Sequence, residues 1–103
     1  MDEELLQALR TVIDPELGID VVSLGLVYGA RREGDVAKVA LTMTTPACPL
    51  GEAIAADARE ALLLRVPELR EAEVELVFEP PWTRDRMSAE ARRQLGVPEE
   101  PPP

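Results

Sequence analysis

The chain has 103 residues and a formal net charge of −9, from 20 acidic and 11 basic residues, with one cysteine and no histidine. This length suits one domain with a single modest core. The negative charge disfavours nucleic acid and anionic membrane surfaces as partners. The absence of histidine excludes Cys-His and Ser-His-Asp catalysis, and it excludes every zinc site that needs an imidazole.

The sequence also bears on the compartment. Its apolar runs fall short of the roughly 20 residues that a membrane-spanning helix needs. It starts Met1-Asp2-Glu3-Glu4, without the basic and apolar segments of a secretory signal. A single cysteine cannot form an intramolecular disulfide, which agrees with a reducing compartment. We therefore expect a cytoplasmic protein with no membrane partner.

The first 25 residues predict a helix and a turn. Asp2 can cap a helix whose apolar stripe runs from Leu5 to Ile13. The pair Asp14-Pro15 ends it, because the residue before a proline is driven out of the helical region. We expect a tight acidic turn at residues 14–18, and a connecting turn or short helix at residues 19–25.

Three alternating segments predict strands, at residues 26–32, 36–44 and 71–79. A hairpin-turn signal at residues 33–35 makes the first two strands antiparallel. A helix expected at residues 49–65 separates the second strand from the third, and a right-handed crossover would make those two parallel.

The third predicted strand leads into the C-terminal region. Trp82, the only tryptophan, is expected to cover an edge of the core. A third helix is expected from residue 83 or 85 to Leu95, because Gly96 and Pro98 stop it.

Together these elements predict an α+β domain over residues 1–96, with a small mixed sheet covered by helices and a short C-terminal helix. Residues 97–103 are rich in proline and glutamate, and we expect a disordered tail there. The sequence leaves open whether the third strand lies beside the first or the second.

Cys48 stands between the second predicted strand and the second predicted helix, with Pro49 in the first helical turn. The free N-H groups and the positive end of the helix dipole would lower the pKa of a thiol there. A lone cysteine is often only a small buried hydrophobe. However, Pro46 and Pro49 stiffen the loop, which favours a presented side chain.

Four stretches share the order and spacing of one known family. They are Asp14-Pro15-Glu16-Leu17-Gly18, Leu24-Gly25-Leu26-Val27-Tyr28, Thr44-Thr45-Pro46-Ala47-Cys48-Pro49, and Pro81-Trp82-Thr83 with Ala91-Arg92. Through them the chain resembles the PaaD/SufT-like family of iron-sulfur cluster assembly domains over nearly its whole length, excluding the tail. The resemblance implies a two-layer αββαβ fold and a role in maturing iron-sulfur proteins.

The resemblance also implies a site. It places the acidic turn beside the cysteine loop, so that Asp14 and Glu16 would stand near Thr44, Thr45 and Cys48. These five residues are the predicted cluster-binding residues, with Cys48 and Asp14 as metal ligands. Without the resemblance, turn chemistry and solvated charge are the favoured explanation of the two acids.

The predicted site suits transient binding of iron or of an iron-sulfur cluster. The Cys48 thiolate is a soft ligand for iron, and Asp14 or Glu16 could complete the shell weakly or accept the thiol proton. One thiolate per chain suggests a cluster shared between two copies, as a homodimer, or between the chain and a partner. The protein is expected to act as a carrier, or as an adaptor that uses Cys48 as part of a contact surface. The expected partners are the iron-sulfur assembly machinery and apo-protein clients.

Three other interpretations remain open. An accessory maturation component of a phenylacetyl-CoA-type oxygenase would carry additional C-terminal cysteines, which this chain lacks. A thiol enzyme would have neither a resolving cysteine nor a histidine base, so we expect no enzyme. A non-catalytic interaction module would make Cys48→Ser silent in every assay.

Overall fold

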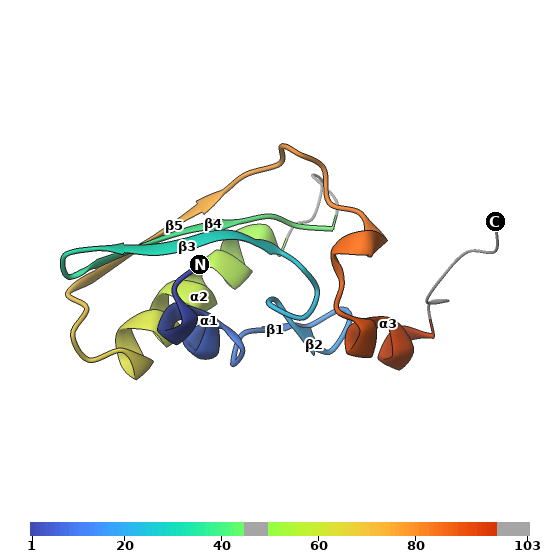
Figure 1. The fold of residues 1–103 in the computed structure, drawn as a ribbon, viewed down its shortest axis with the longest axis horizontal. Helices are drawn as coiled ribbons and strands as arrows, with labels where there is room; N and C mark the ends of the chain where they lie inside the picture. The colour runs from blue at the N-terminus through green and yellow to red at the C-terminus, as the bar shows by residue number, and fades with distance from the viewer. Residues whose placement is uncertain (45–49, 97–103) are drawn as a thin grey trace.

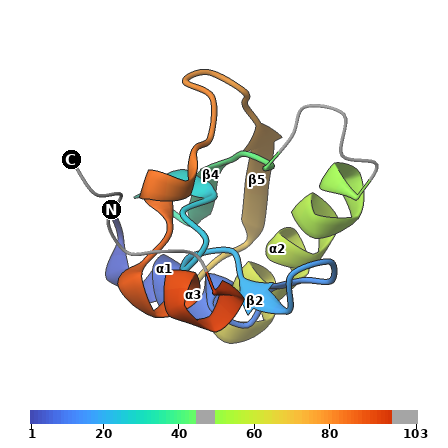
Figure 2. The ribbon, with the colours of Figure 1, turned by 90° about the vertical axis from the view of Figure 1, so that its right-hand side faces the viewer.

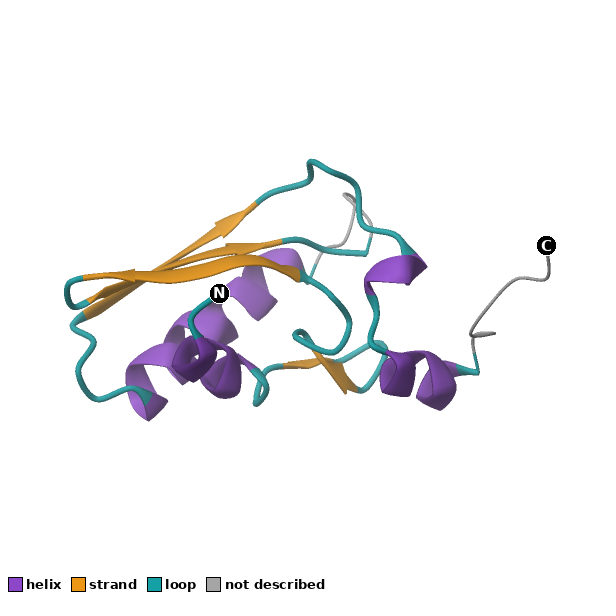
Figure 3. Ribbon diagram, viewed as in Figure 1, coloured by secondary structure: helices purple, strands orange, loops and turns teal. Residues whose placement is uncertain are grey.

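The computed structural model describes residues 1–44 and 50–96. Figures 1 and 3 show a sheet lying over α1 and α2, with α3 away from this layer pair. The α+β class and the two-layer arrangement are confirmed. The elements are, in chain order, α1 (Glu3–Leu9), β1 (Ile13–Asp14), β2 (Ile19–Asp20), β3 (Val27–Glu33), β4 (Val36–Leu41), α2 (Gly51–Arg65), β5 (Glu71–Leu76), the 3-10 helix η1 (Arg84–Arg86) and α3 (Ala89–Leu95).

The main sheet has the strand order β3-β4-β5. The strands β3 and β4 are antiparallel, and Gly34 in the turn between them has a φ of 63°. The strand β5 pairs parallel with β4, as the crossover through α2 predicts. The third strand of this sheet thus lies beside the second and not beside the first.

The core is aliphatic and lies between the sheet and the two helices. The strand β4 buries Ala37, Val39 and Leu41 on its inner side, which confirms the predicted alternation. A bulge between Val27 and Gly29 shifts the register of β3, so the simple alternation expected there is not kept. The largest fully buried side chains contributed by the helices are Leu5, Leu9, Ile54 and Leu62.

The N-terminal helix is shorter than the sequence predicts. Asp2 caps it as expected, by accepting a hydrogen bond from the backbone N-H of Leu5. However, α1 ends at Leu9, because the chain then becomes extended to form a two-stranded ladder between β1 and β2. The ladder takes residues 19–20 of the segment where a connecting turn or short helix is expected, and residues 21–25 form the turn.

Three further boundaries differ from the expectations. The helix α2 begins at Gly51 rather than at residue 49. The strand β5 ends at Leu76, so Phe78 lies beyond it and is exposed instead of pointing inward. The single helix expected after Trp82 is divided into η1 and α3, because Ser88 is extended and caps α3 by accepting a hydrogen bond from Ala91. The predicted tail at residues 97–103 lies outside the described residues.

Residues 80–96, here called the C-terminal arm, are fastened to the turn that precedes β3. The indole N-H of Trp82 donates to the carbonyl of Leu24 at 2.8 Å, and the N-H of Ser88 donates to the carbonyl of Ser23 at 2.8 Å. Trp82 packs against the core as expected. None of the helices within residues 1–44 and 50–96 is long and apolar enough to cross a membrane.

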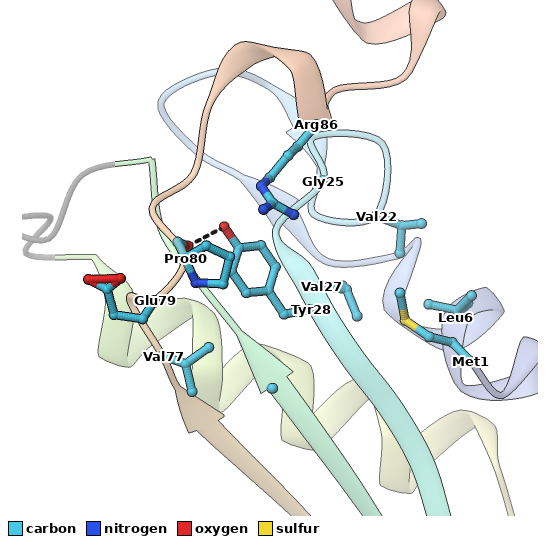
Figure 4. A pocket seen from close by; sticks show the side chains of 11 residues that line it. Met1, Leu6, Val22, Gly25, Val27, Tyr28, Val77, Glu79, Pro80 and Arg86 are labelled. Atoms are coloured by element: carbon cyan, nitrogen blue, oxygen red, sulfur yellow. Dashed lines mark hydrogen bonds between the residues drawn. The ribbon is translucent and has the colours of Figure 1, made fainter.

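Tyr28 adds a second attachment for the arm (Figure 4). Its hydroxyl donates to the carbonyl of Pro80 at 2.7 Å. The guanidinium of Arg86 lies over the Tyr28 ring, 4.6 Å from the ring centre. The arm therefore holds both a neighbouring turn and the first residues of β3.

Candidate functional site

Asp14 is buried at the end of β1, with only 4% of its surface exposed. Its Oδ1 accepts hydrogen bonds from the backbone N-H groups of Glu16 at 2.8 Å and of Leu17 at 3.3 Å. Its carbonyl accepts a third hydrogen bond from Gly18 at 2.7 Å. The carboxylate therefore closes the acidic turn, in the manner of an Asx turn.

The same geometry leaves one oxygen of Asp14 available. Both side-chain hydrogen bonds end on Oδ1, and Oδ2 has no hydrogen-bond partner in the part of the chain that the structure describes. The turn thus fixes the carboxylate while leaving one acceptor atom for a ligand. Glu16 is exposed on the same turn, and its backbone, not its side chain, binds Asp14.

Thr44 is half-buried and follows β4, whereas Thr45 and Cys48 lie outside the described residues. Pro49 also lies outside them, so the expected Cys48 environment stays a prediction. The helix α2 has Leu50 as its N-cap, with no side-chain capping bond. The first N-H groups of α2 thus receive no acceptor from the N-cap side chain.

The chain is anchored on both sides of residues 45–49. A Cβ added to Gly51 would lie 3.4 Å from Cγ of Met43 and 3.4 Å from Cδ1 of Leu76. The end of β4, the start of α2 and the end of β5 therefore pack together at one edge of the sheet (Figure 2). The segment that contains Cys48 is joined to the fold at this edge.

Thr42 is a residue that the strand pattern misplaces. Alternation predicts it on the outer side of the strand, but only 1% of its surface is exposed. Its Oγ1 has no hydrogen-bond partner within residues 1–44 and 50–96, although its N-H donates to the carbonyl of Leu26 at 2.8 Å. Buried hydroxyls nearly always have a partner. The threonine-rich run Thr42-Met43-Thr44-Thr45 is the sequence signal that could have drawn attention to Thr42.

The described residues do not bring the two halves of the predicted site together through hydrogen bonds. Asp14 and Glu16 share one hydrogen bond, and none of the hydrogen bonds within the two described ranges joins either residue to Thr44. Those ranges also contain no group of three or more His, Cys, Asp or Glu side chains that could hold a metal ion. The predicted ligand set of Cys48 and Asp14 stays a prediction.

The described residues define a class of protein: a small α+β domain with a mixed sheet, in which Met43 after β4 and Leu76 at the end of β5 pack at the start of α2. Residues 2–76 match the family described as iron-sulfur cluster assembly protein. The chain belongs to this family, and the resemblance drawn from its motifs is confirmed.

Two relatives are similar to the chain along much of its length. It is 47% identical over 87 residues to the Fe-S protein maturation auxiliary factor SufT of Staphylococcus aureus (strain USA300), covering 84% of this chain and 98% of that protein. It is 52% identical over 75 residues to an iron-sulfur cluster carrier protein of Deinococcus radiodurans, covering 73% of this chain but only 21% of that protein.

A solved structure confirms the fold. The crystal structure of a domain of unknown function, DUF59, from Bacillus anthracis superposes with a TM-score of 0.85 and shares 44% identity. The match covers 91% of this chain and 90% of the other. The related domain therefore shares the overall arrangement of this fold.

Proposed function

We propose that the protein is an iron-sulfur cluster maturation factor that delivers iron or a cluster, or guides the assembly machinery, to apo-protein clients. The observation that carries this proposal is its 47% identity to a maturation auxiliary factor over 98% of that protein's length. The names of both relatives describe maturation or carriage, which supports a role without catalysis.

In the carrier form of the proposal, Cys48 is the principal ligand. Its thiolate binds iron, and Oδ2 of Asp14 completes the shell weakly. The acidic turn supports this role because it holds the Asp14 carboxylate in one orientation through Oδ1. Glu16 would accept the thiol proton, and the hydroxyls of Thr44 and Thr45 would surround the cluster as hydrogen-bonding groups.

The small number of ligands supports a shared, transient site. The sequence has one cysteine and no histidine, so one chain cannot supply the four thiolates of a full cluster shell. Full ligation by four cysteines retains a cluster, whereas a partial shell releases it to a client. We propose that a second copy of the chain, or the client itself, supplies the remaining ligands.

The same observation favours an adaptor as the second candidate. An adaptor needs no complete metal shell, and it would use Cys48 as part of a contact surface. Its partners would still be the assembly machinery and its apo-protein clients. The two candidates differ in whether iron binds to the isolated protein.

Anaerobic loading with iron and sulfide separates them. Three proteins are compared: the wild type, Cys48→Ser, and Cys48→Ser/Ala56→Cys, which restores one thiol per chain at an exposed position of α2. Iron and sulfide content, visible absorption and mass in solution are measured. The carrier form predicts loading in the wild type alone. If none of the three proteins loads iron, the adaptor is favoured. If all three load equally, Cys48 is not a ligand.

A further inference from the structure

A groove of about 420 Å³ lies between α2 and the segment that connects α1 to β1. Ile13 belongs to one wall, and successive turns of α2 form the other. Asp57, Glu60, Ala61 and Leu64 follow the spacing of one helical face, so they make a continuous stripe along that wall. Arg65 lies at the end of this stripe.

Two large apolar side chains stand exposed in this groove. Leu64 has 76% of its surface exposed and Ile13 has 47%. They belong to different elements, yet they line the same depression. Exposed aliphatic side chains that gather in one concave place are typical of a surface that contacts a partner.

Two acids and one base, Arg65, line the groove, so its formal charge is net negative. Asp57 and Glu60 line it one helical turn apart, and neither forms an ion pair within residues 1–44 and 50–96. Their carboxylates are therefore available to a cation from outside. The formal net charge of −9 adds a long-range attraction for basic partners.

We propose that this groove docks a basic amphipathic helix of a partner protein. An aliphatic side chain of that helix would sit between Ile13 and Leu64, while its Lys or Arg side chains would pair with Asp57 and Glu60. Helix-in-groove recognition uses this combination of apolar anchors and flanking charge. A second copy of this chain fits less well, because a two-fold dimer through this face would place the acids of one copy near those of the other.

The groove would add a partner-binding surface to the proposed function, and this surface does not depend on iron binding at Cys48. The groove lies along the middle and C-terminal turns of α2, whereas Cys48 precedes the N-terminus of that helix. A maturation factor needs a contact surface for the machinery or the client in addition to any metal ligand. The groove would act in the metal-free protein as well.

The test uses metal-free protein and a fluorescein-labelled helical peptide of leucine and lysine in a heptad pattern. A peptide with glutamate in place of lysine, and a scrambled leucine-lysine peptide, serve as probes of charge and of amphipathicity. Two variants alter the groove: Leu64→Ser and Asp57→Asn/Glu60→Gln. Their controls are Leu63→Ser on the same helix, and Glu71→Gln/Glu75→Gln on β5, all at exposed positions outside the groove.

We expect the patterned leucine-lysine peptide to bind the wild type, and its affinity to fall about tenfold in Leu64→Ser, as for the loss of an anchor residue. The acid variant should lose affinity and much of the salt dependence, with both controls within about twofold of wild type. Equal losses in the groove variants and controls, equal binding of the scrambled peptide, or no binding at all would overturn the proposal. A concentration-dependent doubling of mass that Leu64→Ser abolishes would replace it with self-association.

Measuring iron loading and peptide binding in Leu64→Ser and Cys48→Ser distinguishes the docking proposal from the proposed function. Leu64→Ser should load iron and sulfide as the wild type does, and Cys48→Ser should bind the peptide as the wild type does. Loss of peptide binding in Cys48→Ser would contradict an independent groove. Failure of iron loading in the wild type, with peptide binding intact, would count against the carrier and leave the groove standing.

Discussion

Gly25 lies so close to Arg86 that a Cβ at residue 25 would overlap the carbonyl group of Arg86. Gly25 also has a φ of 75°, which L-residues with side chains rarely adopt. The two residues are far apart in the sequence, and their contact seats the C-terminal arm on the turn before β3. This contact explains why glycine stands in the Leu24-Gly25-Leu26 stretch.

Gly25→Ala should destabilise the fold by roughly 3 kcal/mol, because it adds backbone strain and displaces the arm. Gly18→Ala is a matched control: Gly18 has a φ of 71°, but nothing lies within 4 Å of an added Cβ. The control should cost only about 1 kcal/mol. Urea unfolding followed by far-UV circular dichroism measures both. Equal losses in the two variants would show that the Arg86 contact contributes little.

The hydrogen bond from Trp82 to Leu24 makes a separate prediction for the arm. Trp82→Phe keeps most of the apolar contact with the core but removes the donor, which leaves the Leu24 carbonyl unpaired. We expect a loss of about 1 kcal/mol in the free energy of unfolding. Thermal unfolding of the two proteins, followed by circular dichroism, provides the measurement. An unchanged midpoint would mean that water replaces the indole at no cost.

The structural role of Asp14 in the turn and its proposed role as an iron ligand can be tested separately. Asp14→Ala removes the acceptor for two backbone N-H groups and should cost roughly 2 to 3 kcal/mol of stability. Asp14→Asn keeps an oxygen at the Oδ1 position and should cost less, but it replaces the free carboxylate oxygen by an amide. If Asp14 is a ligand, Asp14→Asn will fold and yet load less iron than wild type in the reconstitution described above.

If a well-folded Asp14→Asn protein loads as much iron as the wild type, Asp14 has a purely structural role. Glu16→Gln is the matched control for charge, because its side chain is exposed and does not hold the turn. Urea unfolding and iron content are measured on the same samples, so that loss of iron is not confused with loss of fold.

The pH dependence of stability should contain a contribution from Asp2. The hydrogen bond from Arg32 Nε, at 3.1 Å, lowers the pKa of Asp2 below its ordinary value of 3.8, and the N-cap bond from Leu5 lowers it further. A folded-state pKa below the unfolded value stabilises the fold at higher pH, and this stabilisation is lost as the pH falls through the lowered pKa.

The stability difference between wild type and Asp2→Asn should therefore be greatest near neutral pH and shrink below about pH 4. Asn can still accept the capping bond from Leu5 at Oδ1, so the variant removes the charge together with the Arg32 contact at Oδ2. Glu3→Gln, at an exposed position of the same helical turn, is the matched control for the loss of one negative charge. A difference that widens on acidification would contradict the lowered pKa of Asp2.

Local patterns predicted much of this fold. The periodicities of β4 and α2, the turn at Gly34 and the stop at Gly96 depend on neighbouring residues, and the structure has each of them. The parallel pairing of β5 follows from the handedness of crossovers. These features could be inferred because each is decided within a short stretch or by a general rule of chain topology.

Features that depend on distant contacts could not be inferred. The ladder between β1 and β2 has only two residues in each strand, and no periodicity can reveal so short an element. The burial of Thr42 and the Trp82–Leu24 bond arise from packing between segments far apart in the sequence. In the candidate site, the turn at Asp14 follows from local chemistry, whereas Cys48 lies outside the described residues, so its place beside Asp14 stays a prediction.

If the protein matures iron-sulfur proteins through Cys48, transfer of a cluster to an apo-protein depends on that residue. Wild type and Cys48→Ser are incubated anaerobically with iron and sulfide, separated from excess reagents, and mixed with an apo-ferredoxin that has four cysteine ligands. The appearance of holo-ferredoxin is followed by visible circular dichroism. We expect transfer from the wild type and at most a background rate from Cys48→Ser. Equal transfer rates for the two proteins would contradict it.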